Sequence, residues 1–157
     1  MTAYPYRKGA NAIIVDGDNK FLIVQKKNYT DNQWDFPGGG LEDNEEPKVG
    51  ILRELKEELG SDSFTIVKQS PINIKFEWPP EAVEAGYRKH GIYWRGQEKY
   101  QFIAKYTGNI TDLKLQESEI KKLKWEKYSE LQDHLIFNGQ WDNAKLVIEE
   151  ARLNFDE

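Results

Sequence analysis

The sequence predicts an α/β (α+β) fold, in which a mixed central sheet is sandwiched between helices. Short apolar and β-branched segments recur along the chain, and segments with the 3.6-residue period of amphipathic helices lie between them. The 157 residues contain no internal repeat, low-complexity tract or linker. A single domain over residues 1–157 is therefore expected.

The N-terminal part is predicted to begin with two strands. Residues 10–15 and 21–27 are apolar and β-branched, and the Asp-Gly-Asp-Asn sequence at 16–19 favours a turn between them. A short alternating segment at 34–36 then ends at Pro37, which three glycines follow. Glycines allow positive φ angles and close backbone approach to a ligand, but a glycine triplet alone most often marks only a loop, and a loop is predicted here.

A helix is predicted over residues 47–59. Pro47 suits the first turn, where its missing N–H costs no hydrogen bond, and Gly60 suits the position just past the end. At 100° per residue, one stripe of this helix is apolar. That stripe consists of Leu52, Leu55 and Leu59, with Val49 at its edge.

The remaining elements follow the same local signals. Strands are predicted at 64–69, 72–78, 99–106 and 122–126, with a short one at 113–115. The insertion at 81–96 mixes charges and aromatics and is predicted to form a short helix and a mobile loop. Ser129 begins a short helix that ends near Leu135. The last predicted helix covers 141–153, with Leu146, Val147 and Ala151 toward the core.

The composition excludes several classes of function. The chain has no cysteine, which excludes disulfides, thiolate catalysis and cysteine-ligated zinc. Its net charge of −5 argues against duplex DNA as a partner. No apolar run is long enough to span a membrane and no signal peptide is recognisable, so a cytoplasmic protein without a membrane partner is expected. The chain is compatible with a monomer or a homodimer.

Three glutamates share one face of the predicted helix. Glu54, Glu57 and Glu58 are spaced at i, i+3 and i+4, which places them within an arc of roughly 100°. Like charges at this spacing cost about 0.2–0.5 kcal/mol per pair in an isolated helix. A divalent cation would offset this repulsion; taken alone, the pattern also fits a solvated helix face.

The residues around this helix resemble the Nudix box, G-x(5)-E-x(7)-R-E-U-x-E-E-x-G-U, in which U is apolar. Eight of its nine defined positions are matched, by Gly39, Glu45, Arg53, Glu54, Leu55, Glu57, Glu58 and Gly60. The ninth position holds Ser61 in place of an apolar residue. The resemblance implies a Nudix-type α/β/α sandwich.

The resemblance also implies hydrolysis of a nucleoside diphosphate linked to another group, with Mg²⁺ as cofactor and Mn²⁺ as a possible substitute. It implies that Glu54, Glu57 and Glu58 are metal ligands and that the Gly38 carbonyl is an additional ligand. Arg53 would orient a box glutamate, most simply Glu45. Hard Mg²⁺ prefers such oxygen ligands, and metal clamped on bridging phosphates stabilises charge on the leaving oxygen.

Four further segments resemble one branch of the family, the RNA 5′-pyrophosphohydrolases and plant-type asymmetric dinucleoside tetraphosphate hydrolases. These segments are Tyr6-Arg7, QWDFPGGGLE, FEWPP and WRGQEKYQF. The branch implies a late glutamate as a metal ligand or general base, which corresponds to Glu119 or, as the alternative, Glu117. The implied substrate is a dinucleoside polyphosphate or the 5′-triphosphate end of RNA. The alternatives are a sanitising nucleoside triphosphate pyrophosphatase and a non-catalytic nucleotide-binding module.

Several basic and aromatic side chains are candidates for substrate contacts. The candidates for phosphate are Arg7, Lys26, Lys27 and Lys99, and those for base stacking are Phe76, Tyr100 and Phe137. The four basic side chains could instead be surface charges that do not contact substrate. Aromatics on alternating strands are more often core residues. The two histidines, His90 and His134, are expected at the surface rather than in catalysis.

Overall fold

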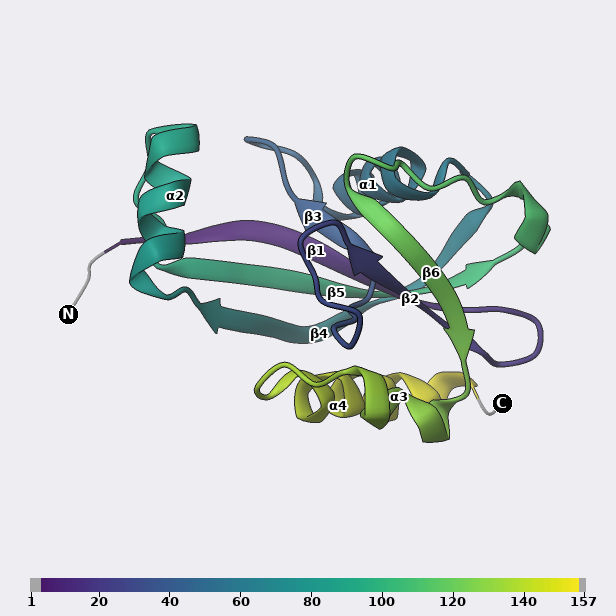
Figure 1. The fold of residues 1–157 in the computed structure, drawn as a ribbon. Coiled ribbons are helices and arrows are strands. Elements are labelled where there is room, and N and C mark those ends of the chain that lie inside the picture. Colours follow the sequence, from purple (N-terminus) through teal and green to yellow (C-terminus); the bar gives the residue numbers. More distant parts are fainter. Residues whose placement is uncertain (1–3, 156–157) are drawn as a thin grey trace.

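The computed structural model describes residues 4–155 and has the predicted mixed α/β architecture (Figure 1). The strands are β1 (Tyr6–Val15), β2 (Phe21–Lys26), β3 (Gly38–Gly40), β4 (Phe64–Glu77), β5 (Gly96–Tyr106) and β6 (Ile120–Glu126). The helices are α1 (Pro47–Leu59), α2 (Pro80–His90), α3 (Tyr128–His134) and α4 (Gln140–Phe155), with a 3₁₀ turn at Ile110–Asp112. None of the helices in this part of the chain combines the length and apolar character that crossing a bilayer requires.

The sheet is mixed, in the order β4-β5-β1-β2-β6. Strands β1 and β5 are parallel and the other pairs are antiparallel. The short strand β3 pairs with the beginning of β1, where Gly39 lies opposite Ala10. This pairing brings the glycine segment, predicted as a loop, into the sheet on the edge of β1 opposite β5, where its glycines meet side chains of α1.

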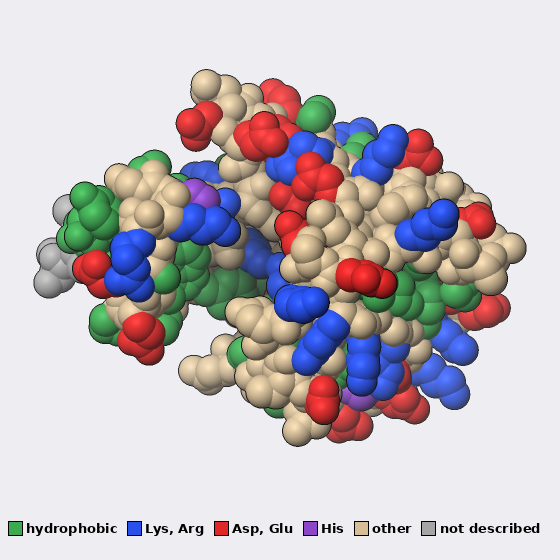
Figure 2. Space-filling view, turned by 45° about the horizontal axis from the view of Figure 1, so that its top comes forward, with side chains coloured by type: hydrophobic (Ala, Val, Ile, Leu, Met, Phe, Trp, Pro, Cys, Tyr) green, Lys and Arg blue, Asp and Glu red, His purple; other side chains and the backbone are tan. Residues whose placement is uncertain are grey.

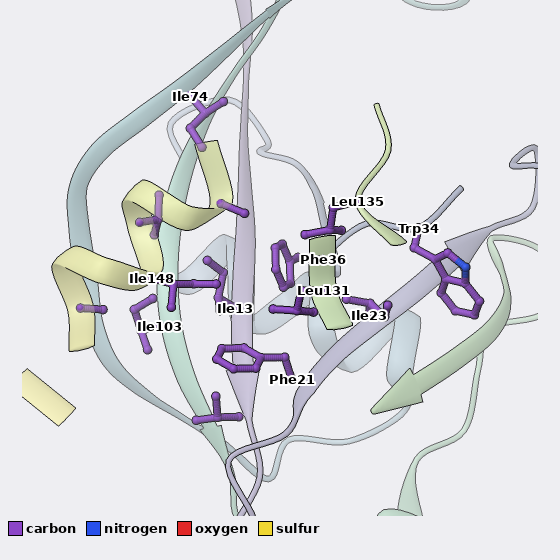
Figure 3. Close-up of a cluster of buried hydrophobic side chains, with 14 residues drawn as sticks. Ile13, Phe21, Ile23, Trp34, Phe36, Ile74, Ile103, Leu131, Leu135 and Ile148 are labelled. Atoms are coloured by element: carbon purple, nitrogen blue, oxygen red, sulfur yellow. The ribbon is translucent and has the colours of Figure 1, made fainter. Parts of the chain in front are cut away.

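Helix α1 covers one face of the sheet, whereas α3 and α4 cover the other (Figure 1). Each face buries its own apolar cluster. Figure 3 shows the cluster on the α3–α4 side, where Ile13 and Ile103 from the strands meet Leu131 and Ile148 from the helices. Helix α2 buries no residue and stands at one end of the sheet, away from both clusters.

Helix α1 has the bounds that the sequence predicts. The helix ends before Gly60, which caps it in the left-handed conformation with a φ of 67°. The Gly60 N–H donates to the Lys56 carbonyl. Leu55 and Leu59 are buried as expected, together with Ile51. Val49, predicted at the edge of the stripe, is exposed.

Two predicted strands are joined in the structure, and another is absent. The predicted strands at 64–69 and 72–78 form one continuous strand, β4, which ends one residue earlier at Glu77 and in which register shifts absorb the intervening Ser-Pro. No strand forms at 113–115, because the preceding residues fold into a 3₁₀ turn that Asn109 caps through its side chain.

The predicted inner face of α4 is wrong at one position. Val147 and Ala151 are buried as expected, but Leu146 is 57% exposed. Ala144 and Ile148 complete the buried stripe with the other two, at the i, i+3, i+4 and i+7 spacing of one helix face. Leu146 falls outside that stripe and faces solvent.

Candidate active site

Close contact between β3 and α1 places the glycine segment against a carboxylate. A Cβ atom built on Gly39 would lie 2.6 Å from Glu54 Oε2, so any larger residue there would displace this carboxylate. Gly38 has a φ of 152°, and a Cβ there would lie 2.0 Å from the Ala10 carbonyl oxygen on β1. The two glycines therefore allow β3 to pack closely against the β1 backbone and against the Glu54 carboxylate of α1.

Three carboxylates converge at this contact. One oxygen each of Glu54, Glu58 and Glu119 lies within 4.8 Å of the other two. Glu54 and Glu58 are one turn apart on α1, while Glu119 comes from the loop before β6. That loop is tied to β2 by the Lys27 N–H bond to the Glu119 carbonyl, 2.8 Å.

Of the two late glutamates, the structure brings only Glu119 into the cluster. Glu117 is exposed, and its carbonyl accepts a hydrogen bond from Lys27 Nζ at 3.1 Å. The side chain of Lys27 is thereby directed at the outer loop rather than at the carboxylates.

Glu58 is the buried member of the cluster, at 3% exposure. Burial raises the pKa of its carboxyl to about 7, although the nearby Lys26 charge and the Gly38 N–H oppose this shift. The Gly38 N–H donates to Glu58 Oε1 at 3.0 Å, and Lys26 Nζ donates to the Gly38 carbonyl at 3.3 Å. Burial likewise raises the pKa of Glu54. The nearby positive charge and hydrogen-bond donor therefore do not fully offset the cost of burying these carboxylates in their ionised form.

Arg53 connects the acids at the start and the middle of α1. Its Nε and Nη2 bind both oxygens of Glu45 at 2.8 and 2.9 Å, which is the bidentate geometry of a strong ion pair. Its Nη1 lies 3.1 Å from Glu54 and 3.3 Å from Glu57, and its Nη2 donates to the Gly40 carbonyl at 3.1 Å. Glu57 therefore lies beside the cluster, half-exposed and held by Arg53, rather than inside it.

The donor set fits a hard divalent cation. Three carboxylate oxygens within 4.8 Å could approach one ion together, and an exposed member leaves the site open to solvent. Burial favours the neutral form of Glu58, and a bound cation would shift it back toward the ionised form that ligation requires.

A family model described as the NUDIX domain matches residues 5–148 of this chain. The chain belongs to the Nudix family. Family membership confirms the predicted enzyme class, a hydrolase that acts on acid anhydrides.

Curated Nudix relatives are similar over most of the chain. The chloroplastic Nudix hydrolase 26 of Arabidopsis thaliana is 27% identical over 146 residues, which cover 93% of this chain and 62% of that protein. The chain therefore spans less than two thirds of that relative's length. The RNA pyrophosphohydrolase of Zymomonas mobilis is 29% identical over 140 residues, which cover 87% of this chain and 88% of the relative.

Solved Nudix structures share the fold. The E. coli dihydroneopterin triphosphate pyrophosphohydrolase has a TM-score of 0.71 at 16% identity and covers 92% of this chain and 99% of its own. A C. elegans Ap4A hydrolase binary complex has a TM-score of 0.66 at 18% identity and covers 95% and 99%. At these identities the likeness shows the fold alone, and it confirms the predicted α/β sandwich.

The Nudix box departs from its consensus only at Ser61, and the structure accommodates the change. Ser61 is buried, and its Oγ accepts the Ser63 N–H at 3.0 Å. A local hydrogen bond therefore replaces the apolar contact that this position usually makes.

The predicted substrate contacts lie in different surroundings. Lys26 lies at the cluster, as described above. Arg7 lies over the Trp94 ring, with Cζ 5.0 Å from the ring centroid. Phe137 is partly exposed and meets Tyr29 edge-on, whereas Phe76 packs against the α3–α4 core cluster. Tyr100 and His90 both line a cavity next to the box, and His134 lies against Trp34, away from the carboxylates.

Lys99 is buried at 6% exposure, and its Nζ donates to Asn11 Oδ1 at 3.1 Å. The sequence suggested neither this partner nor this burial, because both depend on the register that places β5 beside β1. The contact of Arg7 with Trp94 was missed in the same way, although the WRGQ segment marks the tryptophan. Lys99 would reach a phosphate only by leaving Asn11.

Replacing Lys99 with methionine should change how stability depends on pH. Burial lowers the pKa of Lys99 to about 8. Between pH 8 and the unfolded value near 10.5, the unfolded chain binds more protons, so wild-type stability should rise by about 3 kcal/mol as the pH increases through this window. Below pH 8 the buried charge destabilises the fold, and Lys99→Met should remove that cost. Urea denaturation of both proteins at pH 7 and 10.5 measures the difference; parallel pH profiles would show that folding does not lower the pKa of Lys99.

Proposed function

We propose that this protein is a Mg²⁺-dependent Nudix pyrophosphohydrolase that cuts a phosphoanhydride bond in a dinucleoside polyphosphate or at the 5′-triphosphate end of RNA. The observation that carries the proposal is the convergence of Glu54, Glu58 and Glu119 within 4.8 Å beside the glycines of β3. The substrate choice is supported by relatives named RNA pyrophosphohydrolase and by the Ap4A hydrolase among the structural neighbours.

In this proposal the three converging carboxylates hold the cation, and the Gly38 carbonyl would join them only by giving up its hydrogen bond from Lys26. When bound, Mg²⁺ would neutralise charge on the bridging phosphates and lower the pKa of a bound water. Mn²⁺ offers the same preference for oxygen ligands.

The remaining box residues orient the proposed metal ligands or exchange protons beside them. Arg53 fixes Glu54 while its other nitrogens hold Glu45 and the Gly40 carbonyl, so that α1 and β3 keep their spacing. Glu57 is exposed on the same face of α1 and can accept a proton from an attacking water. Glu119, from its exposed loop, is the alternative base. Arg7 and Lys26 supply positive charge for the phosphates on two sides of the cluster.

A non-catalytic nucleotide-binding module is the candidate from a different functional class. Such a module needs no complete set of carboxylates, whereas this chain retains all the acids of the box and adds Glu119 to them. A pyrophosphatase of free nucleoside triphosphates would use the same carboxylates, so only the substrate separates it from the main proposal.

A panel of substrates tests the proposal. Diadenosine tetraphosphate, triphosphorylated RNA, free nucleoside triphosphates and nucleotide sugars are incubated with the protein in Mg²⁺ or in EDTA, and the products are identified. We expect turnover of the first two, abolished by EDTA and strongly reduced in Glu57→Gln. Equal turnover of nucleotide sugars would contradict the substrate assignment, preferred cleavage of free triphosphates would favour the sanitising enzyme, and binding without cleavage would favour the module.

A further inference from the structure

A second hollow opens next to the carboxylate cluster, under the end of α2. It has a volume of about 640 Å³, which falls in the range of roughly 300–1,000 Å³ for small-molecule sites. One wall carries Arg7, His90, Trp94 and Tyr100, and the other is the box loop at 41–45 with Pro47. We call this hollow the α2 cleft. Figure 2 shows α2 standing out from the body of the molecule, with Lys and Arg side chains bordering the hollowed surface between them.

Helix α2 and the residues that flank it overhang the α2 cleft, and contacts between aromatic rings, rather than packing against the core, support them. The Trp94 ring lies 6.4 Å from that of Trp78 and 5.1 Å from that of His90. Trp94 is only partly buried, so it still presents surface to the cleft. A partly exposed indole beside a guanidinium is a suitable surface for stacking a nucleobase.

Arg7 lies between the cleft and the carboxylates. A Cβ atom built on Gly40 would lie 2.6 Å from Arg7 Nη2, so the guanidinium rests directly on β3. Gly39, the adjacent residue of β3, contacts Glu54 in the same way. The carboxylate cluster and the α2 cleft are therefore in contact with two adjacent residues of β3, Gly39 and Gly40.

The charge of Arg7 is not neutralised by an ion pair with any acid in residues 4–155. The guanidinium instead lies against the Trp94 ring and the backbone of Gly40. By contrast, Lys8 and Arg95 on either side are paired with Glu98 and Glu77. An unpaired guanidinium at the junction of a metal site and an aromatic cleft is placed to bind a phosphate group that spans both.

We propose that the α2 cleft binds a second nucleoside of the substrate, on the opposite side of the cut from the first. Its base stacks on Trp94, its phosphate meets Arg7, and Asp43 and Asn44 on the facing loop offer hydrogen-bonding groups to base or ribose. The inference depends on the proposed phosphoanhydride hydrolysis and narrows the proposed substrate to a polyphosphate with a nucleoside at each end. A polyphosphate with a nucleoside at each end fills both sides of the cut, whereas a 5′-triphosphate end of RNA has only phosphate on one side.

A pair of substrates that differ only in the second nucleoside tests this proposal. We compare kcat/KM for diadenosine tetraphosphate with that for adenosine 5′-tetraphosphate, which has the same number of phosphates and one adenosine. From the usual strength of base–aromatic stacking, we expect the wild type to favour the two-ended substrate by roughly 5- to 150-fold. Trp94→Ala should reduce this preference to about 2-fold or less.

Two further variants distinguish an effect of the residues that line the α2 cleft from a general effect of changes in helix α2. Tyr87→Ala removes an exposed ring of α2 that stacks on Tyr93 and does not line the cleft, and it should keep the full preference. If Trp94→Ala is unstable by thermal melting, His90→Ala tests the same wall from an exposed position and should reduce the preference about 3-fold.

The outcomes also separate this proposal from the function on which it depends. Cleavage of both substrates without a two-ended preference, or a preference that survives Trp94→Ala, would overturn the second nucleoside site alone. An equal loss of turnover on triphosphorylated RNA in Trp94→Ala would likewise overturn it, because RNA does not need the far side. Absence of cleavage of every substrate would refute the proposed function instead.

Discussion

Glu58→Gln should lower kcat by about 1,000-fold on whichever phosphoanhydride substrate the protein cuts. The substitution removes one negative charge from a cluster proposed to hold the cation, and a metal contributes several kcal/mol to such a transition state. The glutamine keeps the shape of the side chain and an oxygen for the Gly38 N–H. Steady-state kinetics in saturating Mg²⁺ measures the loss.

The fold should survive this substitution. Burial already raises the pKa of Glu58 to about 7, so a neutral amide at the same place costs less than the ionised acid. Glu46→Gln is the matched control: it removes an exposed acid next to the start of α1 that caps no N–H with its side chain, and it should leave kcat within about 2-fold. Near-normal turnover in Glu58→Gln, with an unchanged melting temperature, would exclude Glu58 as a ligand.

Arg53→Ala should lower both stability and activity. Arg53 makes charged hydrogen bonds to Glu45, Glu54 and Glu57, and the loss of the bidentate pair alone should reduce the free energy of unfolding by about 2 kcal/mol. Without Arg53 the carboxylates of α1 lose their fixed positions, and groups that orient metal ligands typically contribute about 10–100-fold. Urea denaturation and kcat measurements report the two effects separately.

The acid sensitivity of the same variant gives an independent check. The hydrogen bonds from Arg53 lower the pKa of Glu45 to about 2. The stabilisation from this pair is present above the unfolded pKa near 4.5 and is lost as the pH falls toward 2, so Arg53→Ala should lose less stability than the wild type over that interval. Arg53→Lys keeps the charge but not the two-pronged geometry and should recover little of either effect. Identical acid denaturation curves would contradict the assigned pair.

Local signals explain what the sequence predicts well. Helix α1 begins at Pro47 and ends before Gly60 as expected, because both residues act through their own backbone conformations. The approach of Glu54 to Glu58 follows from helical spacing alone. Glu119 lies 61 residues from Glu58 in the chain, and only the resemblance to known hydrolases suggested that it joins them.

Long-range pairing explains what could not be predicted. Three glycines favour a loop locally, but their pairing with β1 makes them strand β3. Lys99 carries the pattern of a surface residue, and its burial follows from the parallel register of β1 and β5. The α2 cleft also requires two segments that are distant in sequence, the box loop and the WRGQ segment, to face each other.

Anomalous diffraction from crystals grown with Mn²⁺ tests the central claim most directly, since this ion takes the same oxygen ligands as Mg²⁺ and can be located without reference to activity. We expect a peak within coordination distance of Glu54, Glu58 and Glu119, and no peak there in Glu58→Gln crystals. An empty cluster in the wild type, with Mn²⁺ bound elsewhere or not at all, would contradict this claim.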